Sequence, residues 1–183
     1  YSDEDFKEKV NAHLANSMGN LLNRTLSMLV KYFDGEIKPE FISDNQLLQI
    51  AKNKIDIVKN HFDNFAIAEA GQEIMALVDA TNKYVTDNAP WTLAKEEKMD
   101  ECGSVLRTVL EVMCTVSSLI YPFCPNIARS MSTQLGYNLD TRLDDIINMD
   151  YNIIQDGKLI SKEEIKPVFL RLDSEFADKQ SKK

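Results

Sequence analysis

The chain has 183 residues, of which 44% are hydrophobic, and only 6 glycines and 5 prolines interrupt them. This length suits one domain with a sizeable core, and the composition favours a helical globular protein over a disordered one. The net charge of −8, from 29 acidic and 21 basic residues, argues against a generic basic nucleic-acid binder, because such proteins gain affinity by neutralising phosphates.

Helical periodicity dominates the first half of the chain. Apolar residues recur at helical spacing from about residue 3 to residue 33, where Asp34 and Gly35 are expected to end the first helix. Ser43 and Asp44 can cap a second helix that runs to about residue 62, and a third covers residues 66–88. We expect these side chains to face the core: Val10, Leu14, Met18, Leu21, Thr25, Met28 and Leu29, then Leu47, Leu48, Ala51, Ile55 and Val58, then Ile67, Ala70, Ile74, Leu77, Val78 and Tyr84.

A fourth helix is predicted to begin at Pro90 or Trp91, because proline is favoured in a first turn, and to continue towards residue 121. Two prolines, Pro122 and Pro125, then break it. Residues 128–135 are predicted to form a short fifth helix that ends at a glycine.

The helical pattern weakens beyond Gly136. One more turn is expected at residues 142–147, followed by strand-like segments at residues 151–154 and 167–172, with a hairpin turn at Asp156-Gly157. The last five residues are polar and expected to be disordered. The sequence therefore predicts an all-α bundle of about five helices over residues 1–146 and a less regular C-terminal extension over residues 147–183.

The cysteines and the most apolar segments indicate the cellular compartment of the protein. Cys102, Cys114 and Cys124 include no Cys-x-x-Cys pair, so we expect buried, reduced thiols rather than a zinc site or a disulfide framework, as in a cytoplasmic protein. The most apolar window still contains Arg107 and Glu111, so no membrane span is predicted. No signal peptide is visible at the start of the sequence.

A candidate binding site lies on the first and fourth predicted helices. Asn20 and Arg24 are four residues apart and therefore share one helical face. Their amide and planar guanidinium suit the reading of base edges. Trp91, the only tryptophan, follows a proline at a helix entrance and can offer a stacking platform. The pattern indicates a site for unpaired bases, the form in which RNA sequence is most often read.

More ordinary interpretations of the same residues remain open. A polar stripe beside the apolar face of the first helix can be a solvated surface, although it is rich in amides and hydroxyls, which are poor surface helix formers. Trp91 can be a core anchor at a helix start, and one ring face can pack while the other stacks. The stripe consists of His13, Asn16, Ser17, Asn20, Arg24 and Ser27.

Three blocks of sequence, residues 6–28, 80–95 and 119–136, resemble the anticodon-binding domain of methionyl-tRNA synthetases. The resemblance covers roughly residues 1–136 and is most specific in the Asn20/Arg24 pair combined with Ala89-Pro90-Trp91. It implies that Asn20, Arg24 and Trp91 contact a CAU anticodon and that three further residues help to shape the pocket, namely Asn16, Asp79 and Asn82. His13 and Thr86 stand where acidic residues are common in this family, so the charge of the pocket is left open.

No catalytic constellation and no metal-binding motif is found in the sequence. The two signatures that a class I synthetase needs for ATP, His-Ile-Gly-His and Lys-Met-Ser-Lys-Ser, are missing, so the chain is expected to be the C-terminal portion of a larger enzyme. The resemblance implies that the parent ligates methionine to its tRNA with ATP and magnesium. Expected partners are that tRNA and the catalytic domain of the same chain, with no membrane.

Two other functions remain possible from the sequence. The chain could be a protein-interaction helical bundle that uses the polar stripe as a docking face. It could also be the anticodon domain of a neighbouring class I synthetase, for valine, isoleucine, leucine or cysteine.

Overall fold

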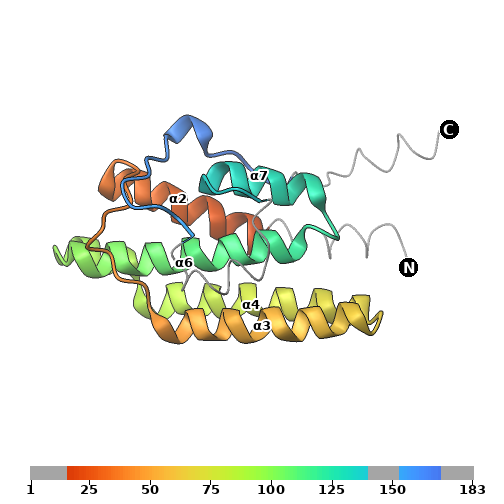
Figure 1. The fold of residues 1–183 in the computed structure, drawn as a ribbon. Coiled ribbons are helices and arrows are strands. Elements are labelled where there is room, and N and C mark those ends of the chain that lie inside the picture. The colour runs from red at the N-terminus through yellow and green to blue at the C-terminus, as the bar shows by residue number, and fades with distance from the viewer. Residues whose placement is uncertain (1–15, 140–152, 170–183) are drawn as a thin grey trace.

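A computed structural model describes residues 16–139 and 153–169 of the chain (Figure 1). Over these residues the chain is helical and contains no strand, which confirms the all-α bundle. The elements are α2 (Asn20–Phe33), α3 (Asn45–Asp63), α4 (Ile67–Asn88), α5 (Pro90–Lys95), α6 (Met99–Ile120), α7 (Pro125–Leu135) and the 3-10 helix η2 (Lys162–Glu164).

The long helix α6 forms the centre of the bundle. In Figure 1, α2 and α7 lie on one side of it, and the α3/α4 hairpin lies on the other. Within the described ranges, α6 is the one helix long and apolar enough to cross a membrane by length and composition, but 94% of that window is buried inside the protein. Contact with helices on both sides explains why most of α6 is apolar.

Most of the predicted helix ends and core positions are confirmed. Asp34 and Gly35 end α2 with left-handed φ values of 53° and 82°. The Asp44 side chain caps α3 by accepting from the backbone N–H groups of Gln46 and Leu47. The five core positions predicted in the second helix are all buried. Ile67 was predicted to be inside but is 46% exposed, because it is the first residue of α4 and lies at the end of the bundle.

The predicted fourth helix is wrong in its length. The structure divides it into α5 and α6, with a break at residues 96–98, where Glu97 has a φ of 60°. The Lys98 N–H donates to the Leu93 carbonyl at 3.0 Å, five residues back, and not to the carbonyl four residues back as in a continuous α-helix. Three consecutive charged residues at the break give the helix no apolar face to bury there. The fifth helix also begins earlier than predicted, at Pro125 in the first-turn position.

The predicted hairpin around Asp156-Gly157 is wrong in its partner. The turn at Asp156-Gly157 exists, but the segment pairs with the loop after α2: the Ile37 N–H donates to the Lys158 carbonyl, and the Ile160 N–H donates to the Gly35 carbonyl. Ile154 and Ile160 are buried, so docking on the bundle satisfies both apolar and backbone groups. Residues 168–169 form a bend, and the expectations for residues 142–147, 151–152 and 170–183 lie outside the described residues.

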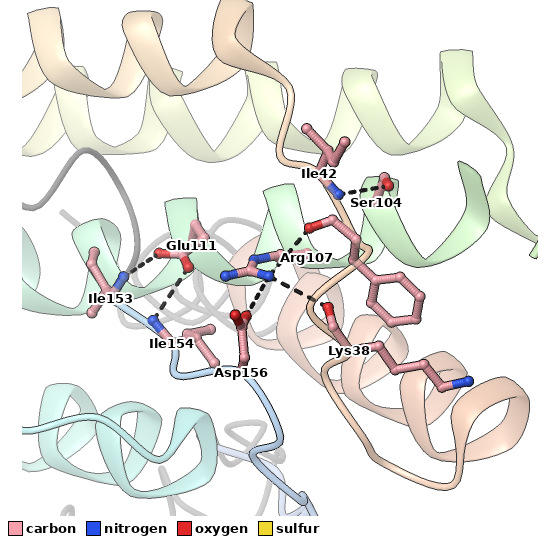
Figure 2. A network of polar contacts seen from close by, with 9 residues as sticks. Lys38, Ile42, Ser104, Arg107, Glu111, Ile153, Ile154 and Asp156 are labelled. Carbon is pink, nitrogen blue, oxygen red and sulfur yellow. Dashed lines mark hydrogen bonds and ion pairs between the residues drawn. The ribbon is translucent and has the colours of Figure 1, made fainter. Parts of the chain in front are cut away.

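Two charged residues on α6 hold this C-terminal segment in place (Figure 2). Arg107 Nη1 donates to Asp156 Oδ1 at 2.7 Å and to the Phe41 carbonyl at 3.2 Å. One turn further along α6, the fully buried Glu111 carboxyl accepts from the N–H groups of Ile153 and Ile154 at 3.0 and 3.2 Å. The pair therefore connects the core helix to two loops.

The stability contributed by Glu111 should depend on pH. Burial raises the pKa of its carboxyl from an ordinary 4.5 to about 7 in the folded protein. A raised acid pKa means that the folded state binds more protons, so this contribution is present below pH 4.5 and is lost as pH rises through 7. Relative to Glu111→Gln, which does not titrate, the wild type should lose about 2 kcal/mol between pH 5.5 and pH 8. Urea unfolding of both proteins at each pH measures this, and a stability difference that does not change with pH would contradict it.

Candidate nucleic-acid interface

The polar stripe on the first helix meets α4 through a chain of side-chain hydrogen bonds. Arg24 Nη2 donates to Asn82 Oδ1 at 3.0 Å. Asn82 Nδ2 donates to Ser17 Oγ at 3.2 Å, and Ser17 Oγ donates to Asp79 Oδ1 at 3.3 Å. The structure thus brings together three of the predicted site residues, Arg24, Asp79 and Asn82, from segments about sixty residues apart in sequence.

Arg24 is a partly buried cation, and not all of its hydrogen-bond donors have a partner among the described residues. Burial lowers the pKa of its guanidinium from its usual value. Its Nε is buried and has no hydrogen-bond partner within residues 16–139 and 153–169. Nη2 is the atom held by Asn82. Because guanidinium donors lie in one plane, fixing one of them also fixes the direction of the others.

Asn16 and Asn20 lie exposed on the same helical face as Arg24. Asn20 is the first residue of α2, and residues 16–19 before it form a π-helical turn. Asn20 makes no side-chain hydrogen bond to any other residue that the structure describes. Single π-helical turns such as residues 16–19 are frequent at functional sites.

Trp91 lies in the first turn of α5 and is 37% exposed, so its ring is not fully enclosed by the core. The preceding residues set the direction of this turn. Ala89 has a left-handed φ of 41° between α4 and α5, and Pro90 is buried. The thiol of Cys102 on α6 donates to the Pro90 carbonyl at 3.3 Å, and burial raises the pKa of that thiol to about 11, so it keeps its proton.

The other residues considered in the sequence, Trp91, Thr86 and His13, do not all join this hydrogen-bond network. Trp91 has no hydrogen bond or ring contact with Arg24, Asp79 or Asn82 among the described parts of the chain, so it is not joined to their network. Thr86, one of the departures from the family pattern, donates to the Asn82 carbonyl at 3.0 Å and brings no charge to the site. His13 lies outside the described residues.

Ser17 is the one member of this hydrogen-bond chain that the sequence did not single out. It was placed on the polar stripe, without a role, although it lies two helical turns before Arg24 and hence on the same face. The three cysteines are free; Cys102 and Cys114 are buried, as expected, whereas Cys124 is only half-buried. No group of His, Cys, Asp and Glu side chains that could hold a metal ion occurs in the portions of the chain that the structure covers.

Comparison with known sequences gives consistent matches. A sequence model described as "Anticodon binding domain of methionyl tRNA ligase" matches residues 39–182. The chain is 36% identical over 179 residues to a methionine–tRNA ligase of Caldanaerobacter subterraneus subsp. tengcongensis, and 34% identical over 181 residues to that of Streptococcus pneumoniae serotype 4. Each alignment covers 96% of this chain but only 27% and 26% of the relative, so the chain spans about a quarter of their length.

Solved structures have the same fold. The apo form of Mycobacterium tuberculosis methionyl-tRNA synthetase superposes with a TM-score of 0.80 at 28% identity, covering 94% of this chain and 35% of that one. The same enzyme in complex with methionyl-adenylate also gives a TM-score of 0.80 at 28% identity, over 93% and 34% of the two chains. The family match begins after α2, whereas these alignments cover nearly the whole chain, including that helix.

Proposed function

We propose a function from the premise that this chain belongs to the family of anticodon-binding domains of methionyl-tRNA ligase. The chain binds the anticodon loop of the methionine tRNA and distinguishes CAU from other anticodons. The observation that carries this proposal is the Arg24–Asn82 hydrogen bond of 3.0 Å, which orients a base-reading guanidinium beside the exposed amide of Asn20.

Each residue of the site has a separate role in this proposal. Asn20 and Arg24 recognise base edges by hydrogen bonds, and Asn16 extends the same row of amides. Trp91 stacks on an unpaired base, which tolerates any base because every base has a π face. Asp79 and Asn82 shape the pocket from α4. Base identity is therefore read by α2, and α5 contributes sequence-independent affinity.

The acidic charge of the chain fits recognition of bases better than recognition of the phosphate backbone. A net charge of −8 disfavours broad contact with phosphates. A pocket for a few unstacked bases needs few cations, and the rest of a larger enzyme can contact the tRNA elsewhere. We therefore propose that this chain works as part of a longer protein, together with a catalytic domain that joins methionine to its tRNA using ATP and magnesium. Such an enzyme would act in the cytoplasm.

The proposal is tested by titrating the chain with three labelled stem-loop RNAs, followed by fluorescence anisotropy. The first carries CAU, the second differs from it in the first anticodon base, and the third has an unrelated loop. We expect the first to bind most tightly. Equal binding of all three would contradict a base-reading site, and no binding by the folded protein would favour the protein-interaction bundle. Tighter binding of the altered anticodon would favour a neighbouring synthetase.

Substitutions at Trp91 separate stacking from packing. Trp91→Ala should weaken binding of the CAU stem-loop by about 1–3 kcal/mol, the scale of one base–aromatic stack. Phe or Tyr at this position should keep much of the affinity, because both offer a flat ring. If Trp91 is only a core anchor, Trp91→Ala should instead lower stability by about 3–5 kcal/mol and leave the affinity of the folded protein normal. Thermal melts and titrations of the same variants distinguish these results.

A further inference from the structure

We infer that Ser17 is a positioning residue of the anticodon site, which acts on RNA through Arg24. This inference rests on the proposed function. Ser17 lies in the turn before α2, between the Asp79 carboxylate, to which its Oγ donates at 3.3 Å, and the Asn82 amide, from which it accepts at 3.2 Å. It is therefore the only described residue of the first helical segment that connects both α4 site residues to each other.

The direction of this hydrogen-bond chain is fixed by its chemistry. The Asp79 carboxylate can only accept, so the single hydroxyl proton of Ser17 is directed to it. The Ser17 oxygen is then an acceptor, and Asn82 must present its NH2 group to it. The second N–H of that group is used by the Val78 carbonyl, at 3.2 Å. The carbonyl oxygen of Asn82 is left to face Arg24.

The opposite orientation of the Asn82 amide is unfavourable at both ends. It would place NH2 donors against the Arg24 guanidinium, which has only donors, and an oxygen against the Val78 carbonyl. Ser17 is thus one of two groups, with Val78, that select the orientation in which Asn82 can hold Arg24. Since the Arg24 Nε already has no partner in the described parts of the chain, losing the bond to Asn82 would leave the guanidinium poorly oriented.

An arginine held in place before binding loses less conformational freedom when it binds. Ser17 therefore raises RNA affinity without touching the RNA. This role predicts that removing the Ser17 hydroxyl matters only while Arg24 is present. A residue that contacts RNA itself would keep part of its effect on binding after Arg24 is removed, and one that merely stabilises the helix would keep all of it.

A double-mutant cycle on the full chain tests the inference, with the CAU stem-loop RNA as the probe. Ser17→Ala should weaken binding about three- to tenfold, the scale of one neutral hydrogen bond. The same change in an Arg24→Ala background should have no further effect. Ser17→Thr, which keeps the hydroxyl, should bind like the wild type. Ser130→Ala on α7 removes another half-buried serine hydroxyl and serves as the matched control, with no expected effect.

The outcomes separate this inference from the proposed function. If Arg24→Ala weakens binding and Ser17→Ala does not, or if Ser17→Ala costs the same in both backgrounds, the positioning role is wrong and the anticodon site stands. If Arg24→Ala itself has no effect, the proposed function fails. Should Ser17→Ala unfold the protein, Asp79→Ala removes the acceptor that orients Ser17 and must show the same dependence on Arg24.

Discussion

Replacement of Arg107 by Ala is expected to lower the free energy of unfolding by about 1.5–3 kcal/mol, the scale of a hydrogen bond to a charged group, because Arg107 is buried but its partner Asp156 is 43% exposed. Its guanidinium donates to the Asp156 carboxylate at 2.7 Å and to the Phe41 carbonyl at 3.2 Å, so the change removes donors from two loops at once. Arg107 also lowers the pKa of the buried Glu111 carboxyl. Its loss therefore makes the ionised form of that carboxyl still less favourable.

Urea unfolding at neutral pH measures this loss of stability. Lys98→Ala is the matched control, because Lys98 forms an exposed ion pair with Glu96 at 2.8 Å, and solvent screens the attraction in such pairs. Hydrogen exchange at the amides of Ile153 and Ile154 should also accelerate in Arg107→Ala, as the C-terminal segment detaches. Equal stability losses in the two variants would show that Arg107 does not hold the segment.

Replacement of Arg24 by Ala is expected to weaken binding of the CAU stem-loop by about 1–3 kcal/mol, the scale of a lost bidentate base contact. Lys should restore little of the affinity, because an ammonium group cannot reproduce the planar set of donors that Asn82 orients. The stability of the fold should change much less, since Arg24 is only partly buried and belongs to no described ion pair.

Arg129→Ala provides the control for charge. Arg129 lies exposed on α7, where it donates to the Tyr121 hydroxyl at 2.8 Å, and its removal changes the net charge by the same amount. Asn20→Ala should weaken binding in the same pocket, and its effect should not add fully to that of Arg24→Ala. If Arg129→Ala and Arg24→Ala weakened binding equally, non-specific attraction would explain the affinity.

The sequence predicts those parts of the fold that depend on local signals. Helix ends are recognisable at Asp34-Gly35 and Asp44 because each residue type has a specific backbone or capping preference. The buried positions of α3 follow from helical periodicity alone. The division between α5 and α6 is not predicted in this way, since an unbroken helical pattern on both sides hides a three-residue interruption.

Contacts between distant segments account for the other differences. The pairing of residues 157–160 with the loop after α2 depends on tertiary packing and leaves no local signal. Phe41 packs so closely on Gly103 that an added Cβ would lie 2.3 Å from its ring, which no pattern in the sequence indicates. Arg107 and Glu111 did carry a signal: two opposite charges one turn apart, within the most apolar window, need buried partners.

The arrangement of the candidate site residues was likewise predictable only where it depends on local spacing. Asn20 and Arg24 follow from spacing along one helix, and the family resemblance added Asp79 and Asn82. The hydrogen bonds that join Arg24 to Asn82 and Asn82 to Ser17 cross between two helices, so they become visible only once α2 and α4 are placed together. Trp91 was identified by its uniqueness and its proline, but its partial exposure depends on how α5 turns away from α4.

The fluorescence of Trp91 provides the most direct test of the anticodon site, because this residue is the only tryptophan in the chain. Stacking of an unpaired base on the indole should quench its emission. We expect a saturable loss of emission with the CAU stem-loop, at the concentrations where anisotropy reports binding, and none with an unrelated loop at the same concentrations. Binding of the CAU stem-loop with no change in Trp91 emission would contradict a site in which this ring stacks on the anticodon.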